Sequence, residues 1–205
     1  VQFDTGVFRR VFEKMASGYN ERSRAIVEKV VLHGLAELDF DILIQSSRTG
    51  YVSKVNIAYA IAKQRGIPIT EALALVERGG PAYVPYGAWA ITPDEAVDLI
   101  VQAGGKPVLA HPGDLFLRRS SLPVSERWPM LEQLVAQLVK RGLRGIEVYY
   151  PTHSIETKER LHAIAESFGL METGGSDWHG EQFKPDRALG MGGVTSTVFE
   201  ALISR

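Results

Sequence analysis

The stretch GGSDWHG at residues 174–180 indicates both a strand end and a functional loop, and the apolar pair Leu170 and Met171 leads into it. An apolar run followed by two glycines is typical of a buried strand that ends in a tight loop. Residues two positions apart in an extended segment point the same way, so Asp177 and His179 are placed to share one ligand. Carboxylate oxygens and neutral imidazole nitrogens both bind divalent metals, at about 2.0–2.2 Å for zinc. The stretch therefore indicates either a metal-binding loop or a surface turn in which Asp177 bonds its own backbone.

A second stretch, KPVLAHPG at residues 106–113, has the same construction. Its small and apolar residues 107–110 predict a short buried strand, and His111 stands at the carboxyl end of that strand. Parallel α/β structures gather their chemistry at the carboxyl ends of strands. We therefore expect His111 to join Asp177 and His179 as a third metal ligand. The alternative is a structural histidine that hydrogen-bonds the following turn.

The rest of the chain divides into two parts with different patterns. The first part reads as mostly helical, and Ser17-Gly18 is expected to end one helix before another begins near Glu21. In the second part strands alternate with helices, which implies parallel β/α units with right-handed crossovers. The predicted strands are 107–110, 144–149 and 170–173, and the helices around them are 92–102, 128–141, 154–168 and 195–203.

Composition limits the kinds of protein that this chain can be. The 205 residues carry a formal net charge of −1, so nothing global attracts nucleic acid. No cysteine is present, so any metal must be held by His, Asp and Glu. No run of eighteen apolar residues occurs, and we expect no membrane span and a cytoplasmic location. The opening residues VQFD resemble the interior of a chain, so we expect a fragment that lacks an amino-terminal part.

Taken in order, Ala-His-Pro at 110–112, GIEVY at 145–149 and GSDWH at 175–179 resemble the carboxyl-terminal half of PHP domains, the polymerase and histidinol phosphatase superfamily. The resemblance is closest to stand-alone metal-dependent phosphoesterases with a helical insertion. It implies an α/β fold that is part of a distorted (β/α)7 barrel, with residues 1–90 as the helical insertion domain and 91–205 as the carboxyl-terminal β/α units. It also implies hydrolysis of phosphate esters of nucleotides or short oligonucleotides by water activated at two or three Mn, Fe or Zn ions.

The same resemblance implies roles for individual residues. His111, Asp177 and His179 match the family's later metal ligands and would be the catalytic residues here. Glu147 faces the same rim, and it is interpreted as a residue that orients its neighbours, with a role as a further ligand as the alternative. Substrate contacts are expected from Lys54 and Asn56, where relatives usually carry Arg-Pro-His, and from His153 and Ser154, where a helix begins and suits an anion. For Ser154 the alternative is a helix N-cap only.

Two other functions stay open at this point. The family's first His-x-His motif is missing from the chain, and three ligands cannot by themselves build a cluster of two or three metals. One alternative is therefore a truncated or degenerate domain that binds a phosphorylated ligand or a partner without turnover. The other is amidohydrolase-like C–N hydrolysis, which uses similar ligands. The partners expected are a small phosphorylated substrate or a short oligonucleotide, and the exposed edge of a partial barrel would favour a homo-oligomer.

Overall fold

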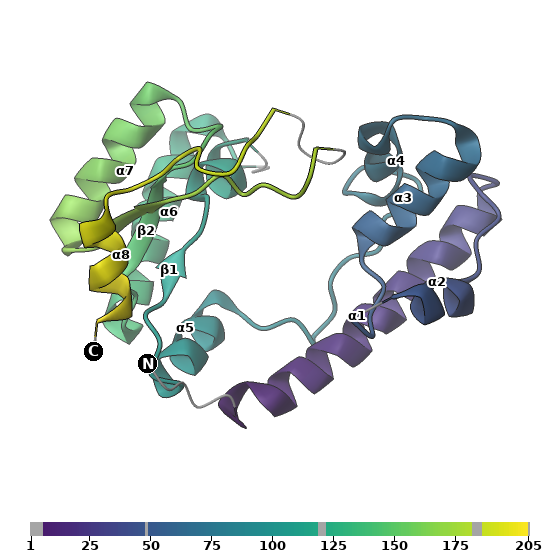
Figure 1. The fold of residues 1–205 in the computed structure, drawn as a ribbon, viewed down its shortest axis with the longest axis horizontal. Coiled ribbons are helices and arrows are strands. Elements are labelled where there is room, and N and C mark those ends of the chain that lie inside the picture. The colour runs from purple at the N-terminus through teal and green to yellow at the C-terminus, as the bar shows by residue number, and fades with distance from the viewer. Residues whose placement is uncertain (1–5, 48, 119–121, 182–185, 205) are drawn as a thin grey trace. The chain divides into compact units, whose positions relative to one another are not determined.

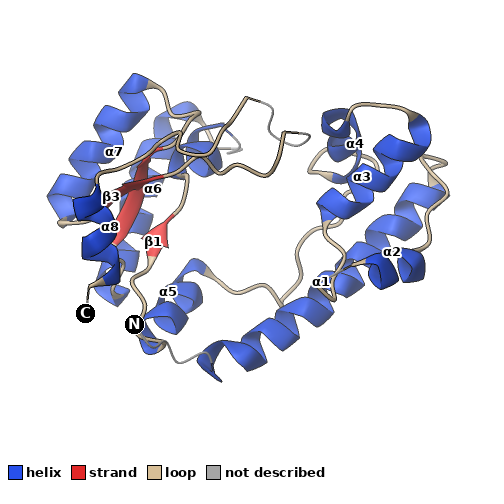
Figure 2. Ribbon diagram, viewed as in Figure 1, coloured by secondary structure: helices blue, strands red, loops and turns tan. Residues whose placement is uncertain are grey.

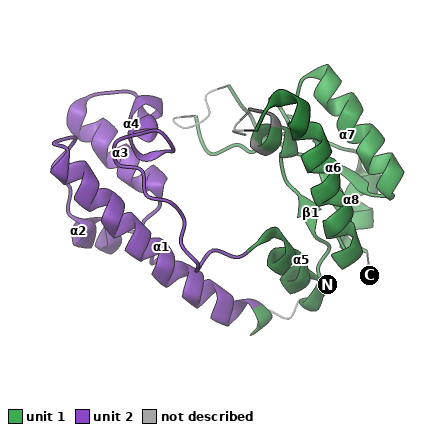
Figure 3. Ribbon diagram, turned by 180° about the vertical axis from the view of Figure 1, so that it is seen from behind, with its two compact units in different colours: residues 1–7, 92–205 green, residues 8–91 purple. Residues whose placement is uncertain are grey.

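The computed structural model describes residues 6–47, 49–118, 122–181 and 186–204. The chain divides into two compact units (Figure 3). Unit 2 comprises residues 8–91, and unit 1 comprises residues 92–205 together with the first seven. Within the described ranges, no helix is long and apolar enough to cross a membrane.

A small parallel sheet organises unit 1 (Figure 2). Its strands are β1 (Val108–Leu109), β2 (Gly145–Tyr149) and β3 (Met171–Gly174), and β2 lies between the other two. Both pairings are parallel, with Val108 opposite Gly145 and Gly145 opposite Met171. The three predicted strands and their parallel arrangement are thus confirmed, and each strand is within two residues of its predicted ends.

Helices pack around this sheet (Figure 1), and a buried apolar layer lies between them and the strands. The helices are α5 (Pro93–Gln102), α6 (Val124–Arg141), α7 (Ile155–Phe168) and α8 (Ser196–Ile203), and a π-helix, η1, spans Gly113–Arg118. Helix α7 contacts both β2 and β3. The core of the unit includes Ile146 and Val148 of β2, Leu131 and Val135 of α6, and Leu161 of α7. Because side chains alternate along a strand, Glu147 is left on the face of β2 away from Ile146 and Val148.

Unit 2 is built from four helices in its described part. They are α1 (Gly6–Leu32), which enters the unit at Phe8, α2 (Phe40–Ser46), α3 (Lys54–Arg65) and α4 (Ile69–Val76). Apolar residues at helical spacing, among them Ile26 and Val30 of α1 and Ile57 and Ile61 of α3, are fully buried in one core. Helix α2 begins where Asp39 accepts hydrogen bonds from the N–H groups of Asp41 and Ile42.

The expected break at Ser17-Gly18 is wrong, because α1 runs through it without interruption. Gly18 is buried, and a Cβ added there would overlap the side chain of Trp89. The glycine is therefore a packing site for the indole and not a helix end. Helix α6 also begins earlier than predicted, at Val124, and includes Pro129 within its second turn.

The central strand should carry much of the stability of unit 1. Ile146 is fully buried, whereas Ile155 at the start of α7 is 78% exposed. Ile146→Ala should lower the free energy of unfolding by about 2–5 kcal/mol, because it removes buried methyl groups and leaves a cavity. Urea denaturation measures this loss, and Ile155→Ala is the matched control. Equal losses for the two variants would contradict the placement of β2 in the core.

Candidate active site

The carboxyl ends of the three strands bring the predicted chemistry of unit 1 together. Parallel pairing places these ends along one edge of the sheet. His111 follows β1, Tyr150 follows β2, and Asp177 follows β3. The rings of His111 and Tyr150 lie 5.3 Å apart, and the hydroxyl of Tyr150 donates to Asp177 Oδ2 at 2.8 Å. Residues from all three strand ends therefore share one site.

The backbone at this site is in an uncommon conformation. Among the described residues, the non-glycine residues with positive φ are His111, at 31°, and Asp177, at 48°. Such backbone costs of order 1–3 kcal/mol at each position and is found mostly where function requires it. At His111 the following proline adds to the restriction. Two of the three predicted metal ligands are thus held in strained positions by the structure around them.

Glu147 holds His111 in place from the neighbouring strand. The backbone N–H of His111 donates to Glu147 Oε2 at 2.7 Å. Burial raises the pKa of Glu147, and the hydrogen bond from His111 opposes that rise. The Nδ1 atom of His111 is buried and has no hydrogen-bond partner among the described residues. An imidazole nitrogen in that state is expected either to bind a ligand or to cost stability.

Asp177 belongs to a closed triangle of polar side chains. Arg187 Nη1 donates to the hydroxyl oxygen of Tyr150 at 2.7 Å and to Asp177 Oδ2 at 3.1 Å, and the Tyr150 hydroxyl donates to the same Oδ2. The guanidinium also lies over the Tyr150 ring, 4.6 Å from its centroid. Burial raises the pKa of Tyr150 to about 12, so its hydroxyl keeps the proton that it donates at neutral pH.

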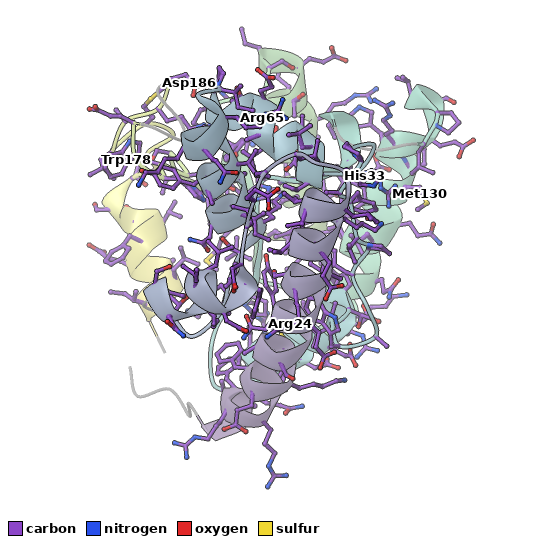
Figure 4. The ribbon with its side chains drawn as sticks, turned by 90° about the vertical axis from the view of Figure 1, so that its right-hand side faces the viewer. Arg24, His33, Arg65, Met130, Trp178 and Asp186 are labelled. Carbon is purple, nitrogen blue, oxygen red and sulfur yellow. The ribbon has the colours of Figure 1, made fainter. Side chains whose placement is uncertain are left out.

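His179 lies at the surface with one ring nitrogen fixed. Its Nδ1 is 2.7 Å from the carbonyl oxygen of Asp177, and a carbonyl only accepts, so Nδ1 carries the proton. The lone pair is then on Nε2, which is the arrangement that metal-binding histidines use. Trp178 between the two predicted ligands is 40% exposed and points outward (Figure 4).

His153 and Ser154 are engaged within the protein. His153 is 5% exposed, its Nδ1 donates to the Val148 carbonyl at 2.9 Å, and its Nε2 accepts from the Gly113 N–H at 3.2 Å. Burial lowers the pKa of His153, which keeps it neutral. Ser154 is exposed and is the N-cap of α7, accepting from the N–H of Thr157. The predicted phosphate contacts of both residues stay predictions.

The other two predicted substrate residues lie in unit 2, at the first turn of α3. Asn56 forms a capping box with Ser53, whose N–H donates to Asn56 Oδ1 at 2.8 Å. Lys54 pairs with Glu77 of the same unit. Both side chains thus stabilise their own unit, and their contact with a substrate stays a prediction.

The donors at the strand ends fit part of a metal centre. Imidazole and carboxylate are suitable ligands for Zn, Mn and Fe, and the buried Nδ1 of His111 lacks any other described partner. However, no group of three or more His, Asp and Glu in the described ranges is arranged to hold a metal ion. The convergence of His111, Asp177 and His179 on one cation therefore stays a prediction.

Tyr150 and Arg187 are the members of the site that sequence reasoning missed. Tyr150 directly follows a predicted strand and carried a usable signal, since residues at strand ends line sites in parallel sheets. Arg187 lies ten residues beyond Asp177 in a loop, and an arginine in a loop is normally solvated. Its burial, at 8% exposure, is visible only in the folded chain.

The chain is similar to several curated proteins over part of its length. No protein-family profile matches the chain. It is 37% identical over 87 residues to a phosphoribosyl 1,2-cyclic phosphate 1,2-diphosphodiesterase of Eggerthella lenta, covering 42% of this chain and 28% of the relative. It is 36% identical over 101 residues to a 3′,5′-nucleoside bisphosphate phosphatase of Chromobacterium violaceum, covering 49% and 32%. It is 36% identical over 102 residues to the 5′-3′ exoribonuclease Rnm of Escherichia coli, covering 50% and 31%. The matches thus span about a third of each curated relative.

Two solved structures share the fold. One is a Bifidobacterium adolescentis protein proposed to be a metal-dependent phosphoesterase, with a TM-score of 0.79 and 24% identity over 98% of this chain and 68% of that one. The other is a Chromobacterium violaceum amidohydrolase with bound sulfate and no metal, with a TM-score of 0.70 and 25% identity over 87% and 60%. The three named sequence relatives are all hydrolases of phosphate esters. The chain is therefore related to phosphoesterases of the PHP superfamily, and the resemblance seen in its ordered motifs is confirmed.

The buried His153 predicts how stability changes with pH. Its pKa is lowered in the folded chain, so the unfolded chain binds the proton more tightly. The contribution of His153 to the free energy of unfolding should therefore be fully present above a pH of about 6.5 and should be lost as the pH falls below it. The loss amounts to about 1.4 kcal/mol for each unit by which the pKa differs between the folded and unfolded chain. Urea denaturation at several pH values measures this slope. His153→Asn should be less stable throughout but less sensitive to acid, whereas His33→Asn on the surface should keep the wild-type slope; parallel curves for His153→Asn would contradict the assignment.

Proposed function

We propose that this chain contributes the carboxyl-terminal part of a metal-dependent phosphoesterase that hydrolyses phosphate esters of nucleotides or short oligonucleotides. In this proposal His111, Asp177 and His179 are the metal ligands and catalytic residues. The sheet of unit 1 is part of a distorted (β/α)7 barrel, and residues 1–90 form a helical insertion domain. The proposal is supported by the nature of the named relatives and by the matching order of the motifs.

One observation carries the proposal more than any other. The described non-glycine residues with positive φ are His111 and Asp177, which lie at the ends of different strands and were predicted as ligands from sequence. A surface turn has no need for strain at two distant positions whose side chains meet around one tyrosine. Strain of this kind persists only where the surrounding structure imposes it, and it concentrates at functional sites.

The residues of the chain would have distinct tasks. A bound divalent cation supplies activation of water and stabilisation of phosphoryl charge. Glu147 would keep His111 oriented through the backbone N–H, and the Asp177 carbonyl would keep the Nε2 of His179 unprotonated. Lys54, Asn56, His153 and Ser154 are proposed to act toward the phosphorylated substrate, with the N-terminus of α7 as the anion-favouring element.

Turnover tests the proposed reaction directly. The protein, loaded with excess Mn²⁺, would be incubated with p-nitrophenyl phosphate, a nucleoside 3′,5′-bisphosphate and a short 5′-phosphorylated RNA. We expect hydrolysis of at least one substrate, and release of phosphate or nucleotide measures it. Elemental analysis of the purified protein gives the metal content alongside. Absence of turnover with metal bound would instead support a domain that binds phosphorylated ligands without hydrolysing them.

Substitution of the proposed ligands should separate chemistry from folding. His111→Ala and Asp177→Asn should each lower kcat/KM by more than about 100-fold, because loss of a ligand costs more than the 10–100-fold typical of its supporting partners. His33→Ala in unit 2 and His162→Ala on α7 are matched controls, since both side chains are exposed and lie outside the cluster. Wild-type activity in His111→Ala would exclude the proposed centre.

C–N hydrolysis is the second candidate, because one structural neighbour is named an amidohydrolase. The three sequence relatives favour phosphate esters. A panel of amides and lactams run beside the phosphate esters, under the same metal conditions, decides between the two. Turnover of the amides alone would identify C–N hydrolysis as the reaction instead.

A further inference from the structure

We propose that Arg187 and Tyr150 are positioning residues that hold Asp177 for metal binding. This inference rests on the proposed function, since it concerns the same site. Arg187 makes no predicted contact with substrate, and nothing in the motifs points to it. Its guanidinium fixes the orientation of one carboxylate and so sets the affinity of the site for its cation.

The hydrogen bonds from Tyr150 and Arg187 both reach the same oxygen of Asp177. Oδ2 receives the Tyr150 hydroxyl at 2.8 Å and Arg187 Nη1 at 3.1 Å. Oδ1 lies on the side of His179, 3.5 Å from its Nδ1. Two donors on one oxygen prevent rotation of the carboxylate about its axis, because rotation would break both bonds. The orientation of the carboxylate, with Oδ1 toward the His179 ring, is thereby fixed.

Arg187 also supports the strained backbone. The same Nη1 lies 3.2 Å from the carbonyl oxygen of Ser176, the residue just before Asp177. Because Asp177 has a φ of 48°, its strained peptide has to be held by surrounding contacts. One guanidinium therefore holds both the backbone that leads into Asp177 and its side chain. The flat guanidinium also stacks on the Tyr150 ring, and a lysine ammonium does not reproduce that contact.

An alternative role for Arg187 is to replace the cation and leave when the cation arrives. Its surroundings favour a permanent position. The side chain is 6% exposed. Besides its ion pair with Asp177 it stacks on the Tyr150 ring and donates to the Tyr150 hydroxyl and the Ser176 carbonyl, so departure would break these three contacts as well. Removal of one partner from a buried pair is strongly destabilising. An arginine that left Asp177 whenever the cation binds would be expected to lie at the surface.

Manganese affinity tests the inference without relying on turnover. Mn²⁺ binding to the 205-residue chain would be measured by calorimetry for the wild type, Tyr150→Phe, Arg187→Lys and Arg187→Gln. We expect Tyr150→Phe and Arg187→Gln to weaken binding by about 10–100-fold, as for partners that orient ligands. Arg187→Lys should recover only part of the loss. Tyr149→Phe and Arg160→Gln are the matched controls, because Tyr149 bonds Glu172 and Arg160 stacks on Trp128, both outside the triangle.

The outcomes separate the inference from the function on which it rests. Unchanged affinity in Tyr150→Phe, which keeps the ring and its packing, overturns the inference while leaving the metal centre intact. Tighter binding in Arg187→Gln also overturns it, since that result identifies Arg187 as a competitor of the cation. A wild type that binds no Mn²⁺ removes the metal centre and the inference together. If Arg187→Gln fails to fold by circular dichroism, Tyr150→Phe still decides.

Discussion

Parallel pairing of β2 with both β1 and β3 is the constraint on which the site depends. It brings the three strand ends to one edge of the sheet, although they lie far apart in the chain, at Leu109, Tyr149 and Gly174. Burial of Ile146 and Val148 against helices fixes which face of β2 is turned inward. A slip of one residue would bury Glu147 and expose Ile146, so the apolar pattern protects the site as well as the core.

The site combines strain with compensating hydrogen bonds. His111 and Asp177 both have positive φ, and each is held by a residue from β2 or directly after it, Glu147 in one case and Tyr150 in the other. Ion pairs with limited exposure, such as that of Asp177 and Arg187, add little net stability because desolvation offsets their attraction. Their effect is better understood as selection of one geometry. Stability comes from the apolar layers, and orientation comes from the polar contacts.

The names of the relatives and the order of the sequence motifs both indicate hydrolysis of phosphate esters. By their names, the relatives act on a phosphoribosyl cyclic phosphate, a nucleoside bisphosphate and RNA, which share a phosphate ester on a ribose. A site that offers imidazole and carboxylate groups at strand ends is suited to that common group. Lys54 and Asn56 of unit 2, which were predicted to contact substrate, bond within their own unit, and their contact with a substrate stays a prediction.

The sequence by itself determined the strands, their parallel arrangement and the places of His111, Asp177 and His179 after them, because apolar runs, glycines and prolines act locally. It could not determine that Gly18 lies inside a helix, since only the distant Trp89 makes a side chain there impossible. Nor could it show that Arg187 is buried beside Tyr150 and Asp177. Those features arise from contacts between residues far apart in the chain, whose geometry exists only after the core has packed.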